Sequence, residues 1–489
     1  MNKNLIILSG LCLVIIGCKC QDSKFNSSKK PNQISLFEEK QRRDIARNNI
    51  KLESKSSSSI FNFREAAKKV TLGVVYIRAT FNHDNNQFFG PINDDFWRRF
   101  FSDVLDSKFK VEASGVIVSS DGYIVTNDHV IENADDIEVL LHDKRVYKAK
   151  VVGIDPETDL ALLKIQETNM NFIEFGNSDD VEVGDWVLAV GNPFNLTSTV
   201  TSGIVSAKAR NINILKRKDA VESYIQTDAV MNIGNSGGAL VDYQGKLIGI
   251  NAAITTPTGA FAGYSFAIPV NIVKKIIDDL LINGKVKRGY LGMVLKNISD
   301  SESRLLNTKI TNGVYVDSLI TGGAAIEAEL KTNDIITAIG NRKIETLAQL
   351  QEIIAQHRPG EKIIITVIRK GKEKKTLLTL KEYEGTETDT LVAMAEMLIN
   401  LGIRLVELSE KEKKQLKLSN GLKITEIKNG KIDTYTSIKP GFIIIKVNGK
   451  AITTREEFIK EYLNTKDVFT LEGVYPSSSI IYFYSFDIG

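Results

Sequence analysis

The chain has few of the side chains from which metal centres and disulfide frameworks are built. Its three cysteines all lie within residues 1–20, so the rest of the chain has no disulfide, thiolate metal site or cysteine nucleophile. Only four histidines are present, and their wide spacing disfavours a zinc site, so we expect no metal and no cofactor. The 63 basic and 60 acidic residues nearly balance, which argues against a nucleic-acid partner.

The composition is otherwise that of an ordinary globular protein. Hydrophobic residues make up 43% and charged residues 25% of the 489 positions. These values exclude a wholly disordered chain, a collagen-like fibre and a polytopic membrane protein. At roughly 150 residues per domain, the length corresponds to about three domains.

Residues 1–20 have the organisation of an export signal peptide. A lysine near the start precedes an apolar stretch, Leu5 to Ile16, that is too short to span a bilayer comfortably. Gly17 before Cys18 resembles the junction at which bacterial lipoproteins are lipidated on the cysteine, although Ile15-Ile16 departs from the usual residues. We predict an exported protein of the periplasm or cell envelope. Lipidation at Cys18, ordinary cleavage and an uncleaved membrane anchor remain open at this point.

The body of the chain begins after a polar linker. Residues 21–59 are rich in Lys, Arg, Ser and Asn, with a short helix expected near residues 36–47. From there on, short β-branched runs alternate with turn residues, which predicts antiparallel β-barrels. This domain should cover residues 60–283 and end in a helix over Ile272–Ile282 that Gly284 terminates.

The C-terminal part contains an internal repeat. Asn312-Gly313-Val314 recurs as Asn420-Gly421-Leu422, and the helix N-cap expected at Thr346 recurs at Thr454 with the same spacing. Two α+β units of similar size follow from this pattern, the second more divergent than the first. These units and the acidic linker between them are expected at residues 286–381, 395–489 and 382–394, respectively.

A serine held between glycines is the strongest chemical motif. In the segment NIGNSGG, residues 232–238, the glycines permit a sharp turn that aims the amides of Gly234 and Ser236 at one point. Two such amides stabilise the oxyanion that forms when a carbonyl is attacked. A Gly-rich hairpin turn without catalytic meaning is the alternative interpretation.

A serine nucleophile needs a base, and the base needs a partner. His129 follows a strand end in TNDHV and its imidazole is suited to proton transfer, although a lone histidine is also typical of surface and core positions. Asp159 immediately precedes an apolar strand and would orient the imidazole, whereas Asp155 and Glu157 lie in the turn and are expected to be solvated. The chain order His, Asp, Ser is that of chymotrypsin-type triads.

Five segments together resemble the HtrA family of exported serine proteases, of the DegP or protease Do type: TNDHVIENADDIEV, DPETDLALLKI, GNPFNLTSTVTSGIVSA, QTDAVMNIGNSGGALVD and GYSFAIPV. The resemblance covers the chain from about residue 63 to its C-terminus. It implies a mainly β fold: a chymotrypsin-like domain of two six-stranded antiparallel β-barrels, with the active site between them, followed by two α+β PDZ domains.

The resemblance also implies roles for individual residues. By motif match, Ser236 is the nucleophile, His129 the general base and Asp159 the carboxylate that orients it. The implied oxyanion-hole amides are those of Gly234, Asn235 and Ser236. The implied P1 pocket consists of Met231, Ile254 and Tyr264, and its apolar character predicts cleavage after small aliphatic residues and not after Lys or Arg. The implied carboxylate-binding loop of the first PDZ domain is Tyr290-Leu291-Gly292-Met293.

Several positions leave alternatives open. Asp128 stands where the family usually has Asn, and its carboxylate either favours protonation of His129 or faces solvent. Residues 81–110 form an insertion rich in aromatics, interpreted either as a disordered loop or as a regulatory and oligomerisation loop. On the helix expected after Thr346, the apolar residues either line a peptide pocket or belong to the core; they are Leu347, Leu350 and Ile354.

These features predict an ATP-independent serine endopeptidase that degrades unfolded or damaged proteins in protein quality control and stress response. Its partners would be unfolded polypeptides and peptide C-termini. The family implies a homotrimer assembled around residues 60–63, or a larger cage formed through the PDZ units. A non-proteolytic PDZ scaffold or chaperone on the same fold is the alternative function, and a surface protein that acts on extracellular components is a third.

Overall fold

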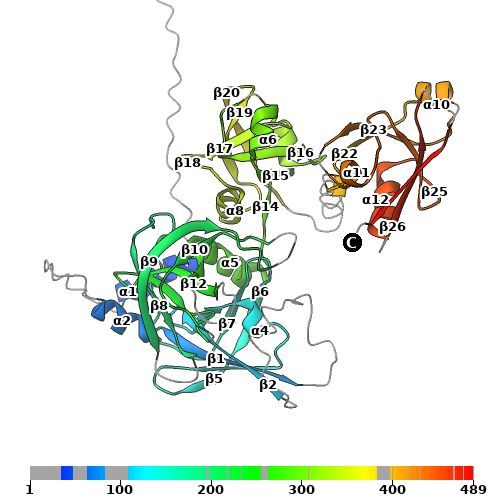
Figure 1. The fold of residues 1–489 in the computed structure, drawn as a ribbon. Helices are drawn as coiled ribbons and strands as arrows, with labels where there is room; N and C mark the ends of the chain where they lie inside the picture. The colour runs from blue at the N-terminus through cyan, green and yellow to red at the C-terminus, as the bar shows by residue number, and fades with distance from the viewer. Residues whose placement is uncertain are drawn as a thin grey trace, which may run out of the picture.

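The computed structural model describes residues 35–47, 63–82, 108–193, 198–254, 263–382 and 397–487, apart from residues 216, 218, 219, 233, 307, 399, 417, 429, 466, 467, 477 and 479. Figure 1 shows a large β domain, a smaller unit above it and a second small unit beside the first. The export signal with Cys18, and most of the insertion at 81–110, lie outside the described residues.

The first half of the large domain is an antiparallel sheet that closes on itself. Its strands follow the order β5-β4-β1-β2-β3-β7-β6. Because Ala149 alone separates β5 from β6, the two ends of this order are continuous in the chain and the sheet curls into a barrel. The strands are β1 (Val74–Asn82), β2 (Lys108–Ile117), β3 (Tyr123–Thr126), β4 (Asp136–Leu140), β5 (Val146–Lys148), β6 (Lys150–Asp155) and β7 (Leu160–Lys164).

The second half is a closed barrel with the order β10-β13-β12-β11-β8-β9. Side chains alternate along β8: Val187 and Ala189 pack inside this barrel, whereas Leu188 and Val190 pack into the apolar layer between the two barrels. The strands are β8 (Trp186–Gly191), β9 (Thr199–Arg210), β10 (Tyr224–Thr227), β11 (Ala239–Asp242), β12 (Leu247–Ile254) and β13 (Ser265–Pro269).

Three helices belong to the large domain in the described part of the chain between residues 63 and 284. They are α2 (Arg64–Thr71), α4 (Asp128–Ile131) and α5 (Val270–Asn283). Helix α5 buries its apolar face on the barrels and ends at Gly284. The φ of Gly284 is +67°, and its amide donates a hydrogen bond to the Leu280 carbonyl, which gives the left-handed cap that the sequence predicts.

Helix α1 (Leu36–Arg47) packs on the large domain, although its sequence lies in the polar segment expected as a linker. Phe37 is 1% exposed, and its ring packs on that of Tyr123 in a T-shaped arrangement, with the two ring centroids 5.3 Å apart. Gln41, one helical turn later, is buried and donates to two main-chain carbonyls of the domain. Asp278 of α5 accepts bonds from the amides of Leu36 and Phe37 at the start of the helix. One buried face within a polar stretch therefore determines the docking.

The two C-terminal units share one topology. Their strand orders are β15-β16-β17-β19-β20 and β22-β23-β24-β26-β27, and each unit has a helix whose N-cap threonine, Thr346 or Thr454, forms a capping box. The repeat seen in the sequence is therefore present in the strand order as well.

The elements of the first unit are β14 (Gly289–Tyr290), β15 (Met293–Asn297), α6 (Asp300–Leu305), β16 (Val314–Leu319), α7 (Ala324–Glu327), β17 (Ile335–Ile339), β18 (Arg342–Lys343), α8 (Leu347–Ala355), β19 (Lys362–Arg369), β20 (Lys372–Thr379) and β21 (Lys381–Glu382). Those of the second are β22 (Ile403–Glu407), α10 (Glu410–Leu416), β23 (Leu422–Ile427), α11 (Lys431–Tyr435), β24 (Ile443–Val447), β25 (Lys450–Ala451), α12 (Arg455–Leu463), β26 (Val468–Val474) and β27 (Tyr482–Asp487).

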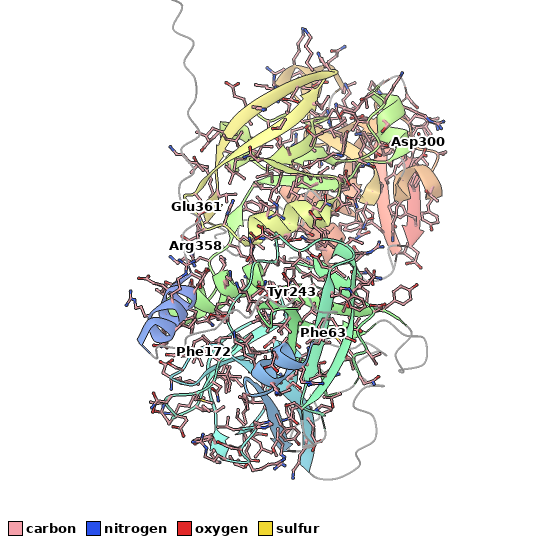
Figure 2. The ribbon with its side chains drawn as sticks, turned by 90° about the vertical axis from the view of Figure 1, so that its left-hand side faces the viewer. Phe63, Phe172, Tyr243, Asp300, Arg358 and Glu361 are labelled. Carbon is pink, nitrogen blue, oxygen red and sulfur yellow. The ribbon has the colours of Figure 1, made fainter. Side chains whose placement is uncertain are left out.

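Polar contacts join the first C-terminal unit to the large domain. Glu352 of α8 is 2% exposed and accepts a bond of 2.7 Å from the Ser223 hydroxyl; this burial raises the pKa of its carboxyl group. Arg342 of β18 pairs with Asp179 at 3.0 Å. Arg358 follows α8 and lies where the first C-terminal unit meets the large domain (Figure 2).

Candidate active site

His129 and Asp159 form a buried pair beside the ends of two neighbouring strands, β3 and β7. His129 lies in α4, which follows β3, and Asp159 directly precedes β7. Nδ1 of His129 lies 2.7 Å from Oδ2 and 2.9 Å from Oδ1 of Asp159, and both side chains are 6% exposed. The His129 amide also donates to Asp159 Oδ1 at 2.9 Å. The carboxylate therefore fixes both the ring and the backbone of the histidine.

A tight turn between β6 and β7 carries Asp159. Asp155 pairs with Leu160 across this hairpin, and Asp159 closes the turn with a left-handed φ of +57°. The expectation that Asp155 is solvated is wrong: it is 2% exposed, because Arg288 from the segment before the first C-terminal unit lies against its carboxylate at 2.6 Å and 2.7 Å. A partner so distant in the sequence has no local signature in the turn.

The loop around Ser236 presents two backbone amides. The amides of Asn235, Gly237 and Gly238 donate to main-chain carbonyls, whereas those of Gly234 and Ser236 have no hydrogen-bond partner among the described residues. Of the three amides expected at the oxyanion hole, that of Asn235 is thus occupied by the Asn232 carbonyl at 3.0 Å. Gly234 and Gly237 have φ of +95° and +79°, which the turn requires.

Ser114, which no sequence motif marks, joins the two barrels at this point. Its amide donates to the Ser236 carbonyl at 2.9 Å, and its hydroxyl donates to the Gly234 carbonyl at 2.6 Å. Its own carbonyl accepts a 2.8 Å bond from the Thr126 hydroxyl, three residues before His129. Ser114 thereby brings the serine loop next to the strand end that leads to the histidine. The only sequence signal was a serine next to Gly115, which does not indicate a functional role.

The structure leaves no space for side chains at the glycine after the serine. A Cβ added to Gly237 would lie 2.2 Å from the Ser114 carbonyl oxygen and 2.3 Å from Thr126 Oγ1. The two barrels therefore touch through backbone at the serine loop. The Ser236 hydroxyl itself lies 3.5 Å from the Ala252 carbonyl.

Asp128, beside the histidine, is buried instead of facing solvent. It is 3% exposed, and its Oδ1 has no hydrogen-bond partner among the described residues. Burial, with the negative charges of Asp159 and Glu132, raises the pKa of Asp128 to about 8. At neutral pH its carboxyl group is therefore mostly protonated, and it resembles the asparagine amide in shape and charge.

The residues expected around the P1 side chain differ in their surroundings. Met231 is 2% exposed and packs in the core of the second barrel, whereas Tyr264 is 51% exposed. The Ile254 backbone pairs with Ser265 across β12 and β13, but its side chain lies outside the described residues.

The loop expected to bind a carboxylate sits at the start of the first C-terminal unit. Leu291 and Met293 are buried, and a Cβ on Gly292 would lie 2.3 Å from the Cα of Gly323, so only glycine fits there. Strand β15, which begins at Met293, is an edge strand of its sheet. On α8, Leu350 is buried in the core, whereas Leu347 and Ile354 are partly exposed.

The arrangement is suited to acyl transfer to a serine. A buried carboxylate fixes an imidazole, a hydroxyl lies on a neighbouring loop, and two amides there have no partner among the described residues. In the described part of the chain, no group of His, Cys, Asp and Glu side chains is arranged to hold a metal ion. Nor does any helix in that part have the length and apolarity needed to cross a membrane.

Comparisons with known proteins agree with this chemistry. Two families match: a trypsin-like peptidase domain at residues 113–250 and a PDZ domain at residues 289–380. A "probable periplasmic serine endoprotease DegP-like" of Chlamydia trachomatis is 36% identical over 429 residues, which are 83% of this chain and 84% of that protein. One of the same description from Pseudomonas savastanoi is 38% identical over 349 residues, covering 71% and 72%. A solved "HtrA-type protease AlgW with tripeptide" aligns with a TM-score of 0.51 at 34% identity, over 67% of this chain and 99% of that one.

Proposed function

Because the chain belongs to the family of DegP-like, HtrA-type serine endoproteases, we propose that it hydrolyses peptide bonds of unfolded proteins through Ser236, His129 and Asp159. The chain is a serine endopeptidase by this membership. The residue roles and the substrate class are the proposal. The observation that carries it is the buried His129–Asp159 pair beside a serine loop that Ser114 holds in place.

The proposed reaction begins with attack of Ser236 Oγ on the scissile carbonyl carbon. His129 Nε2 accepts the hydroxyl proton, because the Asp159 carboxylate, bound to Nδ1, holds the ring in the tautomer whose proton is on Nδ1 and whose Nε2 is the basic nitrogen. The amides of Gly234 and Ser236 stabilise the oxyanion. The imidazolium then protonates the leaving amine, and an acyl-enzyme remains. Water attacks this ester by the same route, which releases the acid and restores the serine.

The substrates we propose are unfolded or damaged polypeptides cleaved after small aliphatic residues. The support is the apolar side chain of Met231 and the absence of acidic residues from the three positions implied for the P1 pocket. Mass spectrometry of peptides released from an unfolded protein would measure this preference. A majority of cleavages after Lys or Arg would contradict it.

The first C-terminal unit is proposed to bind peptide C-termini. The Tyr290–Met293 loop would take the carboxylate through its amides, and the peptide would extend the sheet at the free edge of β15, beside α8. We propose residues 395–489 as a second, divergent PDZ domain, since its strand order repeats that of the first. The domain limits at 60–283 and 286–381 belong to the same proposal.

Location and assembly are proposed from the relatives and from the surface. The relatives named above are called periplasmic, so we propose an exported periplasmic protein, with the export signal at residues 1–20 and Cys18 as the candidate lipid attachment site. A homotrimer is proposed through the start of α2. Phe63 there packs against Trp186 at 5.7 Å, and Trp186 is 43% exposed.

Degradation of an unfolded protein by the purified mature chain tests the proposal. Wild type should release peptides, Ser236→Ala should release none, and Ser202→Ala, an exposed serine of β9, should match wild type. Equal degradation by wild type and Ser236→Ala would contradict the assignment of the nucleophile. Binding of the unfolded protein without cleavage by any variant would instead support the non-proteolytic scaffold or chaperone.

A further inference from the structure

We propose that Arg288, in the segment that leads into the first C-terminal unit, is a positioning residue for the catalytic triad, acting through Asp155 and the turn that carries Asp159. The inference rests on the proposed function, because it assumes that Asp159 orients His129. It adds a residue from outside the protease domain to the determinants of the reaction.

Arg288 is held in place by the backbone that precedes it. The Lys287 amide donates to Asp279 Oδ2 at 3.1 Å, and the Lys287 carbonyl accepts a hydrogen bond from the Lys275 ammonium. Both partners lie on α5, both are buried, and they pair with each other at 3.0 Å. These bonds hold the backbone that enters Arg288 against α5.

The guanidinium of Arg288 contacts a buried carboxylate at the base of the catalytic turn. Its Nη2 lies 2.7 Å from Oδ1 and 2.6 Å from Oδ2 of Asp155. Asp155 also accepts bonds from the Thr158 hydroxyl and, through its carbonyl, from the Thr158 amide at 3.2 Å. Thr158 is 2% exposed and immediately precedes Asp159. The ion pair is thus connected to the Asp159 backbone by the hydrogen bonds between Asp155 and Thr158 and by the peptide bond from Thr158 to Asp159.

The turn has little ability to absorb a shift of Asp155. It closes the β6–β7 hairpin directly, since Asp155 and Leu160 are paired, and Asp159 occupies a left-handed conformation that non-glycine residues rarely adopt. Without Arg288, the Asp155 carboxylate would remain buried with no cation in contact, and such a group draws in water or moves toward it. The displacement would pass to Asp159 and from there to the His129 ring.

The same segment connects this turn to the first C-terminal unit. Arg288 is followed at once by β14 and by the Tyr290–Met293 loop, and Asp279, which holds the Lys287 amide, also accepts a 2.9 Å bond from Arg358 beyond α8. Figure 2 shows Arg358 at this junction. The position of that unit and the geometry of the triad therefore depend on one set of contacts.

The test measures how fast a small fluorophosphonate inactivates the full chain, a reaction that needs the triad but no peptide site. Arg288→Ala should lower the second-order rate constant by about 10- to 100-fold, because a misplacement of about 1 Å at a reacting group can cost about 100-fold. The acid limb of its pH profile should move to lower pH, since a poorly aligned carboxylate stabilises the imidazolium less. Arg288→Lys, which keeps the charge, should recover part of the rate.

Three controls separate this role from general loss of structure. Asp155→Asn should reproduce the Arg288→Ala defect, and the double variant should be no slower than either single one. Arg342→Ala removes another contact between the first C-terminal unit and the large domain, the ion pair with Asp179, and should react like wild type. A merely unfolded fraction would lower the rate by a constant factor at every pH without moving the limb.

Two results would overturn the inference: an Arg288→Ala rate equal to wild type, or an equal loss in Arg342→Ala. If Arg288→Ala does not fold, Asp155→Asn and Arg288→Lys decide the question by the same limb shift. Failure of the proposed function is recognised separately, because Ser236→Ala would then still react with the phosphonate or degrade protein.

Discussion

Replacing Asp128 by asparagine should remove a pH-dependent loss of stability from the protease domain. The carboxyl group is 3% exposed, and its pKa is raised from an ordinary 3.8 to about 8. Below pH 3.8 both folded and unfolded chains hold the proton. As the pH rises toward 8, the unfolded chain releases it while the folded chain keeps it, so the folded state loses relative stability across this window and no further above it.

The magnitude follows from the size of the shift. Each pKa unit corresponds to about 1.36 kcal/mol, so the interval from 3.8 to pH 7 amounts to about 4 kcal/mol as an upper bound. In the Asp128→Asn variant, the buried side-chain amide offsets part of the gain, by about 1–3 kcal/mol if its N–H groups find no acceptor. That offset does not depend on pH. The informative quantity is therefore how much the difference in unfolding free energy between wild type and Asp128→Asn changes from pH 4 to pH 7.

Denaturant unfolding followed by tryptophan fluorescence is the assay. The chain has two tryptophans, Trp97 and Trp186, and both lie in the range assigned to the protease domain, so the signal reports on that domain. Both proteins should carry Ser236→Ala to prevent self-cleavage. Asp136→Asn serves as the matched control, because that carboxylate is half-exposed beside Lys148. If the difference in unfolding free energy between wild type and Asp128→Asn stays constant from pH 4 to pH 7, the raised pKa of Asp128 is refuted.

Three further substitutions test separate contacts. Ser114→Ala should lower kcat/KM about 10- to 100-fold and cost about 1–3 kcal/mol of stability, because the Gly234 carbonyl loses its buried hydrogen-bond donor. Peptide hydrolysis measures the first effect and denaturant unfolding the second, and an unchanged kcat/KM would contradict the role of Ser114. Phe37→Ala should destabilise the chain by about 3–5 kcal/mol in denaturant unfolding, whereas a cost under about 1 kcal/mol would mean that α1 does not dock in solution. Gly292→Ala should abolish binding of a fluorescent C-terminal peptide while phosphonate reactivity persists, and retained binding would move the peptide site elsewhere.

Local patterns predicted most of the elements. Thr346 and Thr454 were expected as N-caps from their spacing, and both form capping boxes at helices α8 and α12. The helix that Gly284 ends is present for the same reason, since a glycine can take the left-handed cap without strain. The mainly β architecture and the protease and PDZ families are confirmed by the strand order and by the family matches.

Contacts between distant segments could not be predicted in the same way. Asp155 looked solvated in its turn, because its partner Arg288 lies 133 positions away. Ser114 belongs to no recognisable motif, although it bonds to the serine loop of the other barrel. Asp128 had two open interpretations, and its burial excludes the one in which it faces solvent. Each case depends on tertiary packing, which residue type and spacing do not encode.

The most direct test of the account is to map the site at which a fluorophosphonate attaches. The account predicts a single adduct on the Ser236 hydroxyl in the wild-type chain, detected by peptide mass spectrometry. The adduct should be lost with His129→Ala and should form about 10⁴-fold more slowly with Asp159→Asn, as expected when the carboxylate no longer fixes the tautomer. An adduct on another residue, or full labelling of Ser236 at the wild-type rate without His129, would contradict the proposed triad.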